Sequence, residues 1–344
     1  MSEPSLKAEA WALFDRIIER AIGGGLQNYS NPWQSAGAEG ELSYQPDFGV
    51  LEQLLGVPLL LGAASQSGVP ALALDVWTAY ELRRAGFAPD LVWPRAAPPR
   101  ILPSTLIAFL KDATRPQREV LEAMLRSGKT YGNETGASAN ILGKNYVKQV
   151  DVVMSAWNTG PEIMISTKRM DSSFGKNAAN RVEESYGDAK NLRSRHPQAA
   201  LGFLFSLRST ALTPQFENIA EWIIDLLGKL GREDDAYDAV CLIIPDWSEA
   251  VPAPTGDDED EEDPLVSAGI EVGSETEEVP LPLPLPDSEL DQRLHRLPPV
   301  GLLRDAVPVN LSPEVFFSTI VNRVLDNSPV NFHREARQRR NLAF

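Results

Sequence analysis

The sequence predicts an α/β fold in which a mixed central sheet is flanked by helices and follows a mostly helical N-terminal region. Segments rich in β-branched residues alternate with amphipathic segments between residues 146 and 244, in the order strand, strand, helix, strand, helix, strand. Apolar residues recur at helical spacing in the first 90 residues. Hydrophobic residues make up 43% of the 344, which is enough for a substantial core.

The N-terminal region is expected to be helical, with breaks at glycine and proline. An amphipathic pattern predicts a first helix, which three consecutive glycines end, and a segment rich in Gly, Ser, Asn and Pro follows as a loop. Further apolar segments predict more helices, and a proline-rich stretch between Pro89 and Pro103 separates them from the last. The predicted helices cover 6–22, 50–64, 73–86 and 116–126, and the predicted loop covers 26–49.

The centre of the chain changes character and predicts the sheet. The segments YVKQVDVVM and EIMISTKRM are separated by the turn SAWNTGP, so we expect them to form a hairpin. The predicted strands are 146–154, 162–170, 200–207 and 239–244, the helices between them are 176–195 and 215–230, and a C-terminal helix covers 313–325.

Composition marks a linker near the C-terminus. The run DDEDEED (257–263) repels itself and cannot bury a core, and the run VPLPLPLP (279–286) favours extended polyproline II. We therefore expect four parts: a helical N-terminal region at 1–112, an α/β core at 113–248, an acidic, Pro-rich flexible linker at 249–299, and a C-terminal helix with a basic tail at 300–344.

Cysteine and histidine usage excludes several classes of protein. The single cysteine, Cys241, rules out an intrachain disulfide framework or a Cys-rich zinc site and is typical of a reducing compartment. The three histidines lie far apart, which argues against a His-based metal site or a Ser-His-Asp triad. The start, MSEPSLKAEAW, lacks the basic-then-apolar pattern of a signal peptide, so we expect none. The best apolar run, Val57–Ala64, is about a third of the roughly 20 residues that span a membrane. We expect a soluble, cytoplasmic protein with no membrane partner.

The net charge of −16 is unevenly distributed. Residues 251–291 contain fourteen Asp and Glu and no Lys or Arg, whereas residues 115–208 contain fourteen Lys and Arg against nine Asp and Glu. A basic surface raises the local concentration of polyanions such as DNA or RNA, although an ordinary mixed surface would have the same composition.

The predicted hairpin holds the residues that indicate chemistry. Asp151 lies between two valines, and Glu162, Ser166 and Lys168 share one face of the second strand because side chains alternate along it. A charged side chain in an apolar strand needs a partner or a bound ion. Asp151 and Lys168 therefore form either a structural ion pair or part of an ion-binding site.

Residues 146–208 resemble the PD-(D/E)xK nuclease core shared by many restriction endonucleases. That core has a strand ending in Asp, a turn, a strand with acid-x-Lys, a helix and another apolar strand, so the resemblance implies a restriction-endonuclease-like sheet. It also implies that acids bind Mg²⁺, with Mn²⁺ as a possible substitute, and that the lysine lies beside the attacking water and the scissile phosphate. Asp151 and Lys168 match, but Ser166 stands where the second acid is expected.

This departure resembles a subgroup of type II restriction enzymes in which the second acid has moved to the following helix. Glu183 and Glu184 follow Lys168 with fourteen and fifteen residues between, one or two more than in that subgroup. Either could complete a metal site with Asp151, or Glu162 on the strand could replace them. Metal-ion hydrolysis needs at least two oxygen ligands that leave positions open for water and phosphate.

Hydrogen-bond donors around the motif suit contacts to a phosphate backbone. Asn177, Asn180, Glu184 and Asn191 fall on one polar stripe of the predicted helix. The candidate nucleic-acid-binding residues are Lys168, Arg169, Ser172, Ser173, Lys176, Asn177, Asn180 and Arg181.

The resemblance implies a Mg²⁺-dependent DNA endonuclease, either a type II restriction enzyme or another phage-defence enzyme. Its substrate would be double-stranded DNA, and its products would have 5′-phosphate and 3′-hydroxyl ends. We expect a homodimer, because a duplex has two strands to cut. The alternative is a non-catalytic nucleic-acid-binding or assembly subunit, with Ser166 the trace of a lost acid. The acidic segment is either a solvating linker or a DNA mimic that competes for the basic surface.

Overall fold

The structure is a computed structural model that describes residues 5–23, 28–36, 41–64, 67–126, 139–172, 174–248 and 285–341. Within these ranges the side chains of residues 36, 41, 125–126, 175–180 and 182 are not described. The central acidic part of the predicted linker, residues 249–284, lies outside the described residues.

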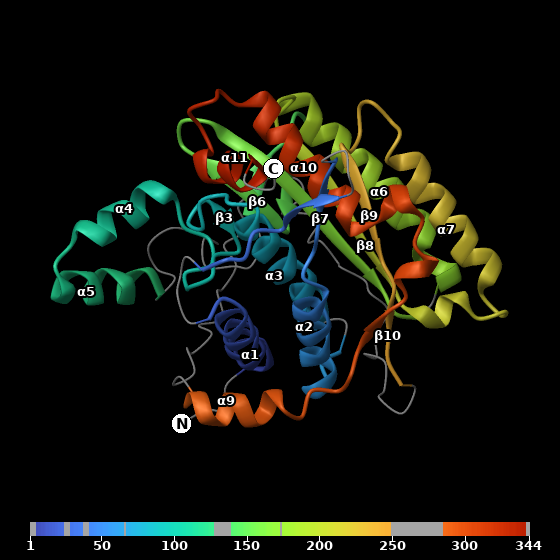
Figure 1. Ribbon diagram of the computed structural model, residues 1–344, viewed down its shortest axis with the longest axis horizontal. Helices are drawn as coiled ribbons and strands as arrows, with labels where there is room; N and C mark the ends of the chain where they lie inside the picture. The colour runs from blue at the N-terminus through green and yellow to red at the C-terminus, as the bar shows by residue number, and fades with distance from the viewer. Residues whose placement is uncertain are drawn as a thin grey trace.

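A five-stranded mixed sheet forms the centre of the molecule (Figure 1). Its strand order is β3-β6-β7-β8-β9, with β3–β6 and β6–β7 antiparallel and β7–β8 and β8–β9 parallel. The predicted α/β fold with a mixed sheet is thus confirmed. The strands are β3 (Val92–Trp93), β6 (Val152–Ala156), β7 (Gly160–Met170), β8 (Ala200–Leu207) and β9 (Ala239–Ile243).

Helices cover both faces of this sheet, because alternate residues of its strands are apolar on either side. Ile163 and Ile165 of β7 share a core cluster with N-terminal helices and α10 (Pro313–Asn327). Met164 belongs to the opposite cluster, with α6 (Phe174–Arg195) and α7 (Glu217–Leu230). The β7 side chains predicted to share a face therefore do so, and β7 is buried from both sides.

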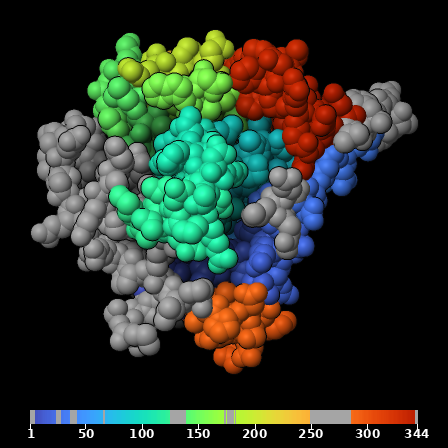
Figure 2. Space-filling view, turned by 90° about the vertical axis from the view of Figure 1, so that its left-hand side faces the viewer, coloured from blue at the N-terminus to red at the C-terminus, as the bar shows by residue number. Residues whose placement is uncertain are grey.

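The helical N-terminal region is also confirmed, and it packs directly on the sheet. Figure 2 shows α4 and α5 projecting toward the viewer, between α11 (Arg334–Asn341) above and α9 (Asp287–Leu294) below. The core cluster that contains Ile165 includes side chains from the N-terminal helices and from the C-terminal α10. The predicted boundaries at 112, 248 and 299 stay predictions. The helices of this region are α1 (Leu6–Ala21), α2 (Phe48–Leu60), α3 (Val69–Arg84), α4 (Ser104–Asp112) and α5 (Arg115–Arg126).

The first predicted strand, 146–154, is wrong as a single strand. β5 (Val147–Val150) pairs with β4 (Ala139–Leu142) in a separate two-stranded sheet, whereas β6 starts at Val152 and pairs with β7. The chain bends at Asp151 because the residues before and after it pair with different strands. Asp151 therefore lies at a junction between two sheets.

Three segments expected to be irregular form regular structure. Within the predicted loop 26–49, β1 (Trp33–Ala36) pairs with β2 (Glu41–Tyr44). Within the predicted linker, α9 is tied to α1 by the guanidinium of Arg16, which binds the carboxylate of Asp291 at 2.8 Å. The predicted basic tail contains α11. Residues far apart in sequence stabilise these short elements, so local patterns did not indicate them. The remaining short strands are β10 (Pro245–Asp246) and β11 (Gly301–Leu302).

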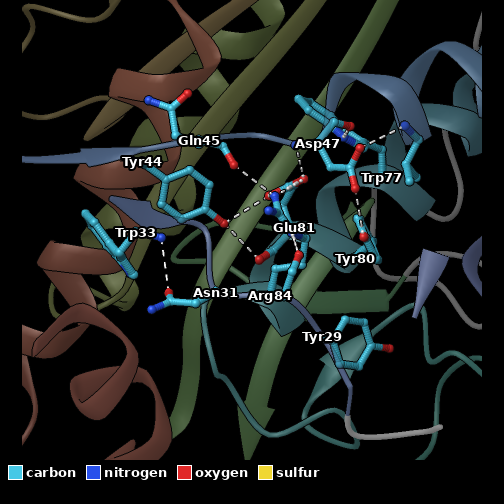
Figure 3. A network of polar contacts seen from close by, with 12 residues as sticks. Tyr29, Asn31, Trp33, Tyr44, Gln45, Asp47, Trp77, Tyr80, Glu81 and Arg84 are labelled. Atoms are coloured by element: carbon cyan, nitrogen blue, oxygen red, sulfur yellow. Dashed lines mark hydrogen bonds and ion pairs between the residues drawn. The ribbon is translucent and has the colours of Figure 1, made fainter. Parts of the chain in front are cut away.

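A buried carboxylate of α3, that of Glu81, connects this helix to β2 and to the start of α2 (Figure 3). The carboxylate of Glu81 accepts hydrogen bonds from the guanidinium of Arg84 at 2.7 and 3.0 Å, from the hydroxyl of Tyr44 at 3.1 Å and from the backbone amide of Asp47 at 2.8 Å. Glu81 is completely buried. Three donors from different elements therefore depend on one carboxylate.

We expect Glu81→Ala to lower the free energy of unfolding by about 3–5 kcal/mol, because it leaves the buried charge of Arg84 without its partner. Urea unfolding followed by circular dichroism measures this. The matched control is Glu119→Ala, which removes an exposed i,i+4 pair with Arg115 and should change stability by less than about 0.5 kcal/mol. Equal effects of the two substitutions would contradict this role for Glu81.

Candidate functional site

Two carboxylates hold Thr167, the middle residue of the Ser166-Thr167-Lys168 motif. The backbone amide of Thr167 donates to Oδ2 of Asp151 at 2.8 Å, and its hydroxyl donates to Oδ1 of Asp75 at 2.5 Å. Asp75 lies on α3, and Thr167 and Asp75 are 4% and 5% exposed. The motif is thus held by Asp151, which precedes β6, and by Asp75 of α3.

The register of the hairpin places Asp151 beside the motif. Val152 pairs with Ile165, so the residue before Val152 lies next to Ser166. Because side chains alternate along β7, Ser166 and Lys168 face the α6 side of the sheet, opposite to Thr167. Ser166 is buried and Lys168 is half-buried. Asp151 therefore lies beside Ser166 and Thr167, and Lys168 lies on the same face as Ser166, two residues further along β7.

Tyr237, which precedes β9, lies beneath this group and was not predicted. Its hydroxyl donates to the backbone carbonyl of Ser185 on α6 at 3.0 Å and lies within hydrogen-bonding range of Ser166. Burial raises the pKa of Tyr237 well above its usual value, and the negative charges of Asp188 and Asp151 raise it further. Both carboxylates therefore lie near this phenol, which stays protonated and acts as a donor.

Asp188 fastens α6 to the small β4–β5 sheet. Its Oδ2 lies 3.0 Å from the ammonium of Lys148, and its Oδ1 accepts a hydrogen bond from the Tyr146 hydroxyl at 2.9 Å. Asn191, one turn further on, accepts from the backbone amides of residues 145 and 146 and donates to the carbonyl of Tyr146 at 3.0 Å. Asn191 is 2% exposed, so this member of the predicted polar stripe is buried against the segment before β5.

The geometry of α6 separates the two candidate glutamates. Both Glu183 and Glu184 are exposed. Successive helical residues are about 100° apart, so Glu183 lies about 200° from the buried Ser185, on the opposite side of the helix. Glu184 lies one turn before Asp188 and on the same flank. Of the two, Glu184 therefore lies on the side of α6 that faces the β4–β5 sheet.

Glu162 is wrong as an alternative acid for this site. It lies five residues before Thr167 on β7, a separation of about 16 Å in an extended strand. Its Oε2 lies 2.7 Å from Nε2 of His333, and its Oε1 accepts a hydrogen bond from Thr159 at 2.8 Å. Glu162 therefore cannot share an ion with Asp151.

The expected phosphate contacts are only partly supported. Arg169 is 5% exposed and pairs with Asp171 at 2.6 Å, and Arg181 is 6% exposed, so neither presents its guanidinium to the surface. Ser172 is exposed and Lys168 half-buried, as a phosphate contact requires. Ser173 and the side chains of Lys176, Asn177 and Asn180 lie outside the described residues.

The donors at this place are oxygens of carboxylates, the ligand type that Mg²⁺ and Mn²⁺ prefer. Among the described residues, no group of three or more His, Cys, Asp or Glu side chains is close enough to hold a metal ion. Asp151 is the carboxylate that the structure places at the motif, through its contact with the Thr167 amide. A metal site completed by Glu183 or Glu184 stays a prediction.

Sequence patterns contained little signal for the residues that complete this cluster. Asp188 lies in a predicted helix and Lys148 in a predicted strand. Their ion pair could not be predicted, because no local pattern pairs residues 40 positions apart. Asp75 lies in an apolar helix, where an acid needs a partner, and that rule alone could have marked it. Tyr237 lies in the segment between α7 and β9 and had no local signal.

Comparison with known proteins does not assign the chain to a family. No family model, no curated protein and no solved structure matches the chain. In the part of the chain that the structure describes, no helix has both the length and the apolar character that crossing a membrane requires.

We expect Thr167→Val to lower the free energy of unfolding by about 1–3 kcal/mol, because Asp75 then loses a buried hydroxyl donor. Thr159→Val is the matched control, since its hydroxyl also donates to a carboxylate but is exposed; it should cost less than about 0.5 kcal/mol. Chemical denaturation measures both. A Thr167→Val protein as stable as the wild type would show that the Asp75 contact does not hold β7.

Proposed function

We propose that the protein is a Mg²⁺-dependent DNA endonuclease. The observation that supports this most strongly is the pairing of β6 with β7, which brings Asp151 beside the Ser166-Thr167-Lys168 motif. Asp151 and Lys168 are both half-buried, so solvent and a substrate can reach this end of β7. This exposure favours a role in phosphodiester hydrolysis over a purely structural ion pair.

The arrangement of elements supports a restriction-endonuclease-like core. An antiparallel hairpin leads through α6 to β8, which is parallel to β7, and α7 then leads to β9, parallel to β8. This is the order that the sequence resemblance to PD-(D/E)xK nucleases implies. We take the SxK variant, with its second acid on α6, as the form that applies here.

Each residue has a defined role in the proposed reaction. A bound Mg²⁺ would supply Lewis-acid polarisation of the phosphate and a water of lowered pKa. Asp151 and Glu184 would hold that ion, and Lys168 would orient the water and stabilise negative charge on the phosphate. The water oxygen bonds to phosphorus as the bond from phosphorus to the 3′ oxygen breaks, which leaves a 5′-phosphate and a 3′-hydroxyl.

The proposed substrate is double-stranded DNA, and the proposed assembly is a homodimer, in keeping with a type II restriction or other phage-defence role in the cytoplasm. The projecting α4–α5 pair exposes Phe109, Val120 and Met124, an apolar surface of the kind that protein contacts cover.

Inhibition of DNA binding by the acidic segment, which would compete with DNA for the basic surface, stays a prediction. A deletion that tests it should end at 284, because residues 287–294 form α9.

A second candidate is a non-catalytic nucleic-acid-binding or assembly subunit on the same fold. Ser166 favours it, since this residue stands in place of an acid and lies beside the buried Tyr237 hydroxyl. In this case Asp151 would serve only to fix Thr167.

We expect purified protein to nick or cut duplex DNA in Mg²⁺, and chelation by EDTA to abolish the activity. Lys168→Ala and Asp151→Asn should each lower the cleavage rate at least about 100-fold, because each removes transition-state stabilisation. The assay uses methylated and unmethylated genomic DNA, resolved by gel electrophoresis.

Lys144→Ala is the matched control, since Lys144 is an exposed lysine before β5. Cleavage by this variant should equal that of the wild type. Full activity in both Lys168→Ala and Asp151→Asn would remove the assignment. Binding of duplex DNA without cleavage in any divalent ion would favour the second candidate.

A further inference from the structure

A cavity of about 590 Å³ lies at the opposite end of the β6–β7 hairpin from Asp151. It is lined by the hairpin turn, by Arg83 in the last turn of α3 and residues that follow this helix, by Tyr29, and by the segment that leads into α11. Cavities of 300–1,000 Å³ are the usual size for small-molecule sites. Its location, about 16 Å along β7 from Thr167, separates it from the proposed nuclease site.

A buried guanidinium without a carboxylate partner lines this cavity. Arg83 is 4% exposed, and its Nη2 donates to the carbonyl oxygens of Val92 and Pro94. Its Nε has no hydrogen-bond partner among the described residues. Burial and repulsion by Arg100 and Arg95 lower the pKa of Arg83 to about 10, so the group remains charged at neutral pH. A buried cation in this state is stabilised by an anion.

The other charges around the cavity leave a positive excess. Glu162 pairs with His333, and Glu335 pairs with Arg339 at 2.9 Å. Arg334, which is exposed at the mouth, has no carboxylate partner in the described part of the chain. Two guanidiniums, from Arg83 and Arg334, are therefore available for an anion, and guanidinium geometry favours phosphate.

Aromatic rings form the rest of the lining. Phe87 and Phe332 both contact the imidazole of His333 edge to face, with ring centroids 5.3 and 6.2 Å apart. Tyr29 lies apart from the Glu81 network, and no hydrogen bond joins its hydroxyl to the other residues drawn (Figure 3). Phe87 and Tyr29 are buried, whereas Phe332 is half-buried and leaves part of its ring exposed. An exposed aromatic face can bind a planar ring, including a nucleobase, by stacking.

We propose that this cavity binds a nucleoside monophosphate, with the phosphate held by Arg83 and Arg334 and the base packed against Phe332. The Glu162–His333 pair then lies beside the base as a source of polar contacts. The backbone of His333 has φ 50°, an uncommon conformation for a residue other than glycine, and its imidazole contacts Glu162.

Isothermal titration of the full-length protein in EDTA tests this site without any cleavage. The probes are adenosine 5′-monophosphate (AMP), adenosine and inorganic phosphate. AMP should bind saturably, and adenosine and phosphate should each bind at least about tenfold more weakly, because each lacks half of the contacts. Arg334→Ala should weaken AMP binding roughly tenfold, and Ala88→Trp, at the exposed lining position 88, should abolish it.

Arg232→Ala, at an exposed arginine after α7, is the matched control and should bind AMP like the wild type. Circular dichroism checks that each variant folds. The proposal is overturned if AMP gives no saturable heat, if Arg334→Ala and Ala88→Trp both bind it unchanged, or if phosphate alone binds as tightly as AMP. Loss of AMP binding in Lys168→Ala, with binding retained in Arg334→Ala, would place the nucleotide at the other end of β7 and would also overturn it.

Discussion

The hydrogen bonds of Thr167 are the constraint on which the rest of the site depends. Its amide is fixed by Asp151, which ends one small sheet and begins another, and its hydroxyl is fixed by Asp75 on the N-terminal helical layer. These contacts hold β7 at the point where it pairs with β6 and β8. Because side chains alternate along the strand, Ser166 and Lys168 face α6, whereas Thr167 faces α3. Loss of either contact would leave the motif in the sheet but free to shift.

The central strand connects two places with different chemistry. Its C-terminal half lies beside Asp151, Asp188 and Tyr237, where carboxylates and a lysine suit a divalent ion and a phosphodiester. Its N-terminal end contributes Glu162 to a cavity lined by guanidiniums and aromatic rings. The hairpin turn beside this cavity exposes Trp157, which is 92% accessible.

The sequence predicted what depends on local pattern and missed what depends on distant partners. The alternation of Ile163, Met164 and Ile165 predicted the buried central strand. The hairpin register places Asp151 beside Ser166 and Thr167, and a site that also includes Lys168 stays a prediction. The predicted strand through Asp151 was wrong because β4 was not predicted, although it lies only a few residues before β5 and pairs with it in a local hairpin. Burial of Arg169 was missed for a similar reason, since its partner carbonyl, Pro70, lies 99 residues earlier. The sequence also could not separate Glu183 from Glu184. That distinction depends on which side of α6 is buried, and the structure shows this through Ser185.

A manganese soak of crystals of the full-length protein tests the central claim most directly. The account predicts an anomalous scattering peak about 2–2.6 Å from a carboxylate oxygen of Asp151, with a Glu184 oxygen at a similar distance and Lys168 alongside. The peak should disappear in crystals of Asp151→Asn. A peak elsewhere, or none at Asp151 at millimolar manganese, would contradict a metal-dependent nuclease site and leave Asp151 with a structural role only.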